Sequence, residues 1–254
     1  MRGAILITAL ITATVLLQGC AAPGGDASLR LDDLQGVASH DSYKRAIDPP
    51  LLERLLARAG PRMLGLDRAQ PPLAEQLDAG LLLLELDVFH DPDGGRYAEP
   101  AGLALVRSLG ETPAPFDPAP LRDPGFKVLH VPDLDFRSHC PTLRRCLRVL
   151  RSWSEAHPGH LPVAVILDVG QVPLRGFDAV VPLPFDAAAW TALERTLVET
   201  LGPARLITPD EVRGEAVTLR RAVRRGRWPR LAAARGRFLF VLDAPPAVVA
   251  GYLE

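Results

Sequence analysis

The sequence predicts an α/β fold built on a parallel sheet. Short apolar runs recur along the chain, and several are continuous rather than alternating, which is typical of parallel strands buried on both faces. Stretches with helical spacing of apolar residues lie between these runs, so the pattern is one of βα units. Hydrophobic residues make up 48% of the 254 residues, which is enough for the core of one large domain.

Six segments are expected to form strands and five to form helices. The expected strands are residues 35–39, 81–88, 126–131, 163–169, 205–208 and 237–242. The expected helices are residues 49–59, 73–79, 143–157, 185–201 and 209–225. Two of the helices are followed by stop signals, Pro158-Gly159 and Gly202-Pro203.

The strand count bears on the choice between an open doubly wound sheet and a closed barrel. No Gly-x-Gly-x-x-Gly motif follows the first strand, which removes the main sign of a dinucleotide-binding fold. A βα barrel of the TIM type needs eight strands, and only six are visible. Either two strands are not recognised, or residues 31–254 form an incomplete barrel that lacks its C-terminal units; we expect the second.

The N-terminus has the pattern of a targeting segment. Arg2 precedes an apolar run over residues 4–17, which is too short to span a bilayer comfortably. The run ends in Leu17-Gln18-Gly19-Cys20, which resembles a bacterial lipobox. We therefore expect a signal peptide over residues 1–20, lipid on Cys20, a flexible tether over residues 21–30, and an exported protein anchored to a membrane of the cell envelope. The alternative is an ordinary cleaved signal followed by a chance cysteine.

Two cysteines remain once Cys20 is assigned to the anchor. Cys140 and Cys146 are an even pair in an oxidising compartment, and Pro141 favours a bend between them. A disulfide is favoured slightly over two separate buried thiols.

The charge is nearly balanced, with 29 basic and 30 acidic side chains, which argues against a nucleic-acid partner. Eight arginines nevertheless fall between Arg220 and Arg237. They could contact anionic lipid headgroups, but a solvated crossover helix is the favoured interpretation.

Acidic residues and histidines recur at the ends of the first four predicted strands. They are His40 and Asp41, Glu85 and Asp87, His130, and Asp168. The carboxyl ends of parallel barrel strands open on one face, and active sites are built there. These six side chains are therefore expected to form one site.

The expected chemistry follows from the residue types. Glu85 and Asp87 lie on the same face of a strand, and two carboxylates side by side repel each other unless a cation or proton lies between them. Oxygen ligands suit calcium or magnesium, and we favour calcium, with Asp41 and Asp168 completing the shell. His40 and His130 could act as an acid and a base. Taken singly, the carboxylates could be a salt-bridged pair and each histidine a structural residue.

Several blocks of the chain resemble the bacterial calcium-dependent phosphoinositide phospholipases C. The blocks are Val37-Ala-Ser-His-Asp-Ser-Tyr43, residues 72–80 with Leu84-Glu-Leu-Asp-Val88, residues 125–138, residues 206–214 and residues 236–243. The resemblance implies a TIM-type barrel, calcium, histidines at 40 and 130, and metal ligands at 41, 85, 87 and 168. It also implies a phospholipid substrate, cleaved between phosphate and diacylglycerol when the inositol 2-hydroxyl attacks phosphorus.

The chain departs from the family pattern at three points near the site. Asp41 stands where asparagine is expected, Asp168 where glutamate is usual, and Val169-Gly170 where a lysine for the substrate phosphate is usual. Two other functions stay open. A glycerophosphodiester phosphodiesterase would usually begin with His-Arg-Gly, against which His40-Asp41-Ser42 argues, and a degenerate, non-catalytic lipoprotein is the third possibility. The oligomeric state is left open.

Overall fold

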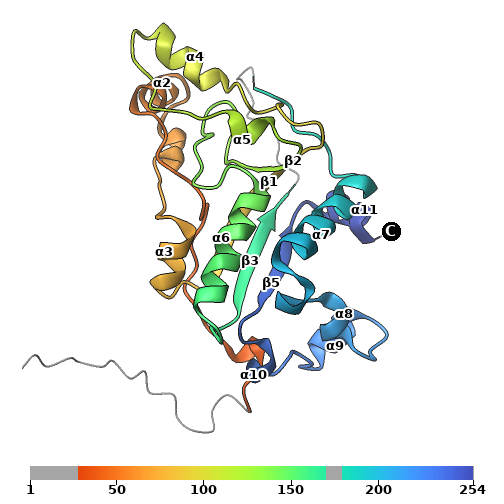
Figure 1. Cartoon of the computed structure of the whole chain (residues 1–254). Helices are drawn as coiled ribbons and strands as arrows, with labels where there is room; N and C mark the ends of the chain where they lie inside the picture. Colours follow the sequence, from red (N-terminus) through yellow and green to blue (C-terminus); the bar gives the residue numbers. More distant parts are fainter. Residues whose placement is uncertain (1–27, 170–178, 254) are drawn as a thin grey trace, which may run out of the picture.

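A computed structural model describes residues 28–169 and 179–253 (Figure 1). The predicted signal peptide, Cys20 and most of the predicted tether lie outside the described residues. None of the helices in the described part of the chain combines the length and apolar character needed to cross a membrane.

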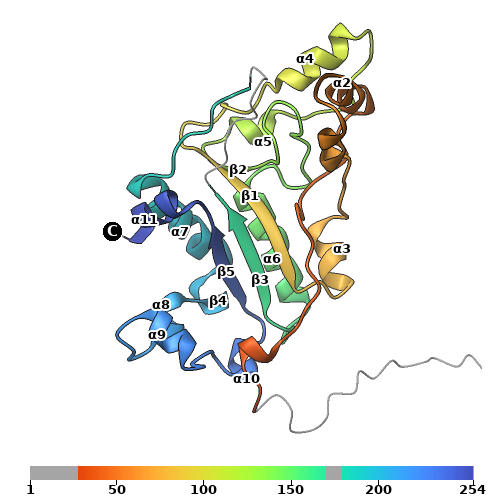
Figure 2. The ribbon, with the colours of Figure 1, turned by 180° about the vertical axis from the view of Figure 1, so that it is seen from behind.

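One curled sheet organises the described residues (Figure 2). Its strands are β1 (Leu83–Asp91), β2 (Gly125–Val128), β3 (Val163–Asp168), β4 (Leu206–Ile207) and β5 (Phe238–Asp243). They lie in the order β2-β1-β3-β5-β4, and β1, β3, β5 and β4 pair in parallel. The predicted α/β class is therefore confirmed, and the curled sheet is consistent with an incomplete barrel.

Two details of the predicted strand pattern are wrong, and the strand order is a further finding that was not predicted. Residues 35–39 contribute only a single parallel bridge, Ala38 to Leu83. The segment predicted at 126–131 becomes β2, which is antiparallel to β1, because β1 continues four residues beyond its pairing with β3 and offers an edge from Val88 to Asp91. Strand β5 lies between β3 and β4. It pairs with β3 along its whole length, and the two residues of β4 pair with its first two residues.

The helices match most of the predicted segments. They are α2 (Pro49–Ala59), α3 (Leu73–Asp78), α4 (Ala101–Ser108), α5 (Ala119–Arg122), α6 (Leu143–Ala156), α7 (Ala187–Leu201), α8 (Pro209–Arg213), α9 (Leu219–Arg224), α10 (Leu231–Ala234) and α11 (Pro246–Leu253), with the short 3-10 turns η1 (Leu31–Asp33), η2 (Pro61–Leu66) and η3 (Pro203–Arg205). The predicted crossover helix 209–225 is broken in two, because Gly214 adopts a φ of 50° and ends α8.

The outer face of the sheet carries the main core. Helix α6 presents Leu143, Cys146, Leu147 and Leu150 at helical spacing, and all four are fully buried among the outward residues of β1, β3 and β5. A disulfide joins Cys140 to Cys146 and ties the start of α6 to the preceding loop. A second buried cluster, formed mainly by α2, α4 and the residues around β2, covers the carboxyl end of β1.

The inner face of the sheet is arranged in three rows. Strand register aligns Leu83 with Ala164 and Leu239, then Glu85 with Ile166 and Val241, then Asp87 with Asp168 and Asp243. Side chains two residues apart in a strand share a face, so each row lies on the same surface. The rows change from apolar to acidic toward the carboxyl ends, and the predicted site lies there.

Candidate functional site

The segment carrying His40 and Asp41 is held along β1 by backbone bonds. The amide of Ser39 donates to the carbonyl of Leu83 at 3.1 Å, and the amide of Ser42 donates to the carbonyl of Glu85 at 3.1 Å. The amide of Glu85 donates in turn to the Ser42 hydroxyl at 2.8 Å. This local pairing places the turn at residues 40–41 beside the middle of β1, although residues 35–39 do not form a full strand.

All six predicted site residues come together in the structure. Three overlapping groups have ligand atoms within 4.8 Å of one another. The groups are His40, Asp41 and Glu85; Asp41, Asp87 and His130; and Glu85, Asp87 and Asp168. Four separate segments of the chain therefore converge on one acidic cluster.

The positions differ in detail from the predicted strand ends. Glu85 and Asp87 lie within β1, at the point where its parallel pairing with β3 ends, because β1 continues to Asp91. Asp168 does end β3. His130 lies beyond β2 in a tight loop, in which Val131 and Asp135 form a backbone bridge. A loop, rather than a strand end, brings His130 to the cluster.

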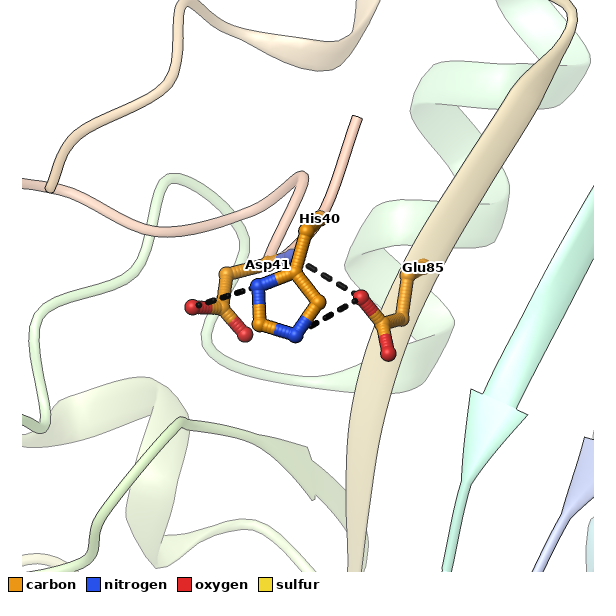
Figure 3. A group of neighbouring side chains, drawn as sticks. All are labelled: His40, Asp41 and Glu85. Carbon is orange, nitrogen blue, oxygen red and sulfur yellow. Dashed lines mark hydrogen bonds and ion pairs between the residues drawn. The ribbon is translucent and has the colours of Figure 1, made fainter. Parts of the chain in front are cut away.

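The imidazole of His40 lies between two carboxylates (Figure 3). Its Nδ1 is 3.3 Å from Oδ2 of Asp41, and its Nε2 is 3.5 Å from Oε2 of Glu85. Asp41 has a φ of 50°, in the left-handed backbone region that residues other than glycine rarely adopt. Its backbone amide donates to Glu85 Oε2 at 3.1 Å. The strained turn directs the Asp41 backbone amide at Glu85 and keeps its carboxylate beside His40.

Negative charge is concentrated around Asp87. The pKa of Asp87 is raised to about 9, mainly by burial and in addition by the neighbouring carboxylates of Asp41, Asp168 and Glu85. Burial and the nearby Asp87 also raise the pKa of Tyr43 well above its ordinary value. The cluster thus carries more negative charge than its own surroundings neutralise, which is the electrostatic condition for holding a proton or a cation.

His130 is fixed by a buried pair that was not predicted. Its Nδ1 lies 2.7 Å from Oδ2 of Asp135, and the same carboxylate oxygen lies 3.2 Å from Nζ of Lys44. Asp135 and Lys44 have fully buried side chains, whereas His130 is 20% exposed. With Nδ1 engaged, Nε2 is the ring nitrogen free to exchange a proton.

Arg68 is another residue that the sequence analysis did not identify, in addition to Asp135 and Lys44. Its Nη2 lies 3.0 Å from Oδ2 of Asp41, so a predicted metal ligand is ion-paired to a half-exposed guanidinium. Asp135 could have been suspected as a carboxylate five residues after His130 in the same block. No periodicity or motif marks Arg68, because its place depends on how the turn after η2 folds back over the cluster.

The structure also contains an apolar cavity of about 270 Å³ at the other end of the strands. It is lined mainly by Leu34, Leu82, Val163, Trp228 and Leu239, and by none of the six predicted site residues. The acidic cluster, which combines titratable groups with partial exposure, is the better candidate site.

The fold and the cluster define a class of protein: an α/β chain with two histidines and a carboxylate set suited to a hard divalent cation near the carboxyl ends of its strands. A family model described as "Phosphoinositide phospholipase C, Ca2+-dependent" matches residues 29–254, and the chain therefore belongs to this family. The family predicted from the sequence blocks is confirmed.

Similar solved structures come from the same family. A calcium-dependent phosphoinositol-specific phospholipase C from Pseudomonas sp, in an apo form, is 17% identical with a TM-score of 0.51, over 87% of this chain and 60% of that chain. A Ca²⁺-dependent phosphatidylinositol-specific phospholipase C from Streptomyces antibioticus is 22% identical with a TM-score of 0.48, over 82% and 51%. The chain thus spans about three fifths of the Pseudomonas protein. No curated protein matches the sequence.

Proposed function

We propose that the chain is a calcium-dependent phosphodiesterase that cleaves phosphatidylinositol-type phospholipids to diacylglycerol and an inositol phosphate. His40 and His130 are the proposed catalytic residues, and Asp41, Glu85, Asp87 and Asp168 the proposed calcium ligands. The proposal includes a TIM-type ancestry for the curled sheet and a membrane anchor on Cys20, which places the enzyme in the cell envelope.

One observation carries the proposal: the six residues chosen from the sequence come from four segments and meet in one cluster. Chance placement would scatter them, because Glu85 follows His40 by 45 positions and Asp168 follows His130 by 38 positions. Membership of the family supports the same reaction class.

The donor set fits calcium. Four carboxylates offer oxygen ligands, which calcium accepts in larger number and looser geometry than magnesium does. Burial, and then the like charges of the neighbouring carboxylates, raise the pKa of Asp87, and a divalent cation would relieve the repulsion between these carboxylates. When bound, calcium would favour ionisation of the attacking hydroxyl and offset charge on the phosphoryl oxygens.

The side chains of the chain have distinct proposed roles. The inositol 2-hydroxyl attacks phosphorus and passes its proton to a carboxylate of the cluster, and the bond from phosphorus to the diacylglycerol oxygen breaks. His40, with 58% of its side chain exposed, donates a hydrogen bond to the charged phosphoryl oxygen. His130, held by Asp135 through Nδ1, delivers a proton from Nε2 to the departing oxygen.

The test is cleavage of phosphatidylinositol by the purified full chain, with calcium or with a chelator. Activity should require calcium, and His130→Ala should lower it by about 100-fold or more. His157→Ala is the matched control, because His157 is half-exposed on the far end of α6 and should keep full activity. Equal activity of the two variants would remove His130 from the mechanism. Release of glycerol phosphate from a deacylated lipid, without cleavage of phosphatidylinositol, would point to a glycerophosphodiesterase instead.

A further inference from the structure

Five arginines form an exposed basic surface on α9 and the turn that follows it. They are Arg220, Arg221, Arg224, Arg225 and Arg227, referred to below as the arginine face. No side chain of the arginine face makes an ion pair or hydrogen bond with another described residue. Nearby Arg213 and Arg237 differ, since they pair with Asp210 and Glu211. The positive charge of the arginine face is therefore directed at solvent, in a chain whose net charge is only -1.

The packing of α9 explains why the arginines point outward. Ala222 is fully buried and Val223 packs on the small core around Ile207 and Val212. These two apolar residues fix the inner side of the helix, so the residues around them fall on its outer side. The sequence alone favoured a merely solvated helix, but two neighbouring features make a binding surface the better explanation.

The first feature is two exposed apolar side chains at the start of α9, one just before the helix and one at its first position. Val217 is 79% exposed and Leu219 is 38% exposed. Apolar side chains beside a group of arginines are the combination found on surfaces that settle into the boundary of an anionic membrane. Glu215 lies in the loop before α9 and is the exposed acidic residue nearest to the arginine face along the chain.

The second feature is where the described chain begins. The amide of Leu31 donates to the carbonyl of Pro229 at 2.9 Å, and the amide of Leu231 donates to the carbonyl of Leu29 at 2.9 Å. Arg30 Nη1 also donates to the carbonyl of Trp228 at 2.7 Å. Residues 29–31 are thus fastened to the segment that directly follows the arginine face. Cys20 and Ser28 are eight Cα–Cα steps apart and so can be separated by about 30 Å at most, which means that a lipid on Cys20 would keep this end of the molecule near the membrane.

We infer that the arginine face, with Val217 and Leu219, binds the surface of an anionic membrane. The inference rests on the proposed anchor for its geometry, but not on the proposed catalysis. It also orients the molecule. The arginine face and residues 29–31 lie near the amino ends of the strands, whereas the acidic cluster lies toward their carboxyl ends (Figure 1). A chain held by the arginine face would turn its acidic cluster away from the membrane that anchors it, toward substrate on a facing surface.

The test measures co-sedimentation of the full chain with vesicles in the presence of a chelator. The protein carries Cys20→Ser, so that no lipid is attached to it. Vesicles of phosphatidylcholine alone are compared with vesicles containing about 30% phosphatidylglycerol. Binding by the apolar N-terminal segment should be similar for both, so the difference reports electrostatics. The chain should prefer the anionic vesicles, and Arg220→Glu/Arg221→Glu/Arg224→Glu should weaken anionic binding by about 100-fold. High salt should remove the preference.

The matched control reverses three exposed arginines on α6, Arg144→Glu/Arg145→Glu/Arg148→Glu, and should retain the preference. The milder Arg220→Gln/Arg221→Gln/Arg224→Gln variant should lose part of it, which guards against misfolding of the charge-reversed chain. Equal binding to both vesicle types would overturn the inference. Loss of the preference in the α6 variant instead would assign membrane contact to the other end of the molecule, and binding to a soluble polyanion but not to anionic vesicles would assign a different partner.

Discussion

The two flanks of the sheet differ in how completely they are covered. On the β1 flank, β2, the 38–44 segment and the 130–135 loop pack over the strand, and Lys44, Asp87 and Asp135 are buried there. On the β5 flank, β4 pairs with only two residues, and the inward residues Val241 and Asp243 are exposed. Charged groups on the β1 flank therefore act in a low-dielectric environment, where pairing and pKa shifts are large. The same residue types on the β5 flank are solvated.

The largest difference in stability between the two flanks is expected when a buried ion pair on the β1 flank and an exposed ion pair on the β5 flank are each broken. Lys44→Met should lower the free energy of unfolding by about 3–5 kcal/mol, because it leaves the fully buried Asp135 carboxylate without its cation. Arg213→Gln on the β5 flank should cost less than about 1 kcal/mol, since its pair with Asp210 is exposed. Urea denaturation of the full chain measures both. Similar losses would show that burial does not separate the two flanks.

Hydrophobic truncations should follow the same division. Leu86→Ala removes a fully buried side chain from the middle of β1 and should cost about 3 kcal/mol. Val241→Ala, on a side chain that is 44% exposed in β5, should cost less than about 1 kcal/mol. If Val241→Ala proved equally costly in thermal unfolding, the inner face of β5 would be buried in solution.

Two aspartates in one row of the sheet test the limits of the site. Asp87 and Asp243 both align with Asp168, but only Asp87 is buried among the other carboxylates. Asp87→Asn should weaken calcium binding by about 100-fold, which is about 2.7 kcal/mol. Asp243→Asn should change it by less than about threefold, because screening weakens an exposed charge. Calorimetric titration with calcium distinguishes them, and a large effect of Asp243→Asn would extend the site onto the β5 flank.

The smallest expected effect concerns His160, which contacts both α6 and β5. The ring of His160 packs in tilted contacts against Trp153 of α6 and Phe238 of β5, and burial lowers its pKa. The unfolded chain then binds more protons than the folded chain just below the ordinary pKa of histidine, so stability should fall as the pH drops through 6.5. The loss should be no more than about 1 kcal/mol and should disappear in His160→Gln. Melting temperatures of both chains at pH 7 and pH 5 test this, and an unchanged slope in His160→Gln would assign the pH dependence to other groups.

Much of the site followed from the sequence because its signals are local. The side chains of Glu85 and Asp87 share a face through the two-residue period of a strand, and His40 and Asp168 sit where apolar runs stop. The apolar period of α6 likewise marked its buried side before any tertiary contact was known. These features depend on neighbours a few residues away, so the amino-acid order determines them by itself.

Other features were decided only by tertiary structure. The antiparallel pairing of β2, the insertion of β5 between β3 and β4, and the division of the 209–225 segment depend on which edges are free after folding. His130 and Asp135 follow Lys44 by 86 and 91 positions in the sequence, yet their side chains are linked to it in the folded protein. Arg68 likewise reaches Asp41 across a folded-back turn. Such partners carry no periodicity, because they are chosen by distance in space and by the cost of burying an unpaired charge.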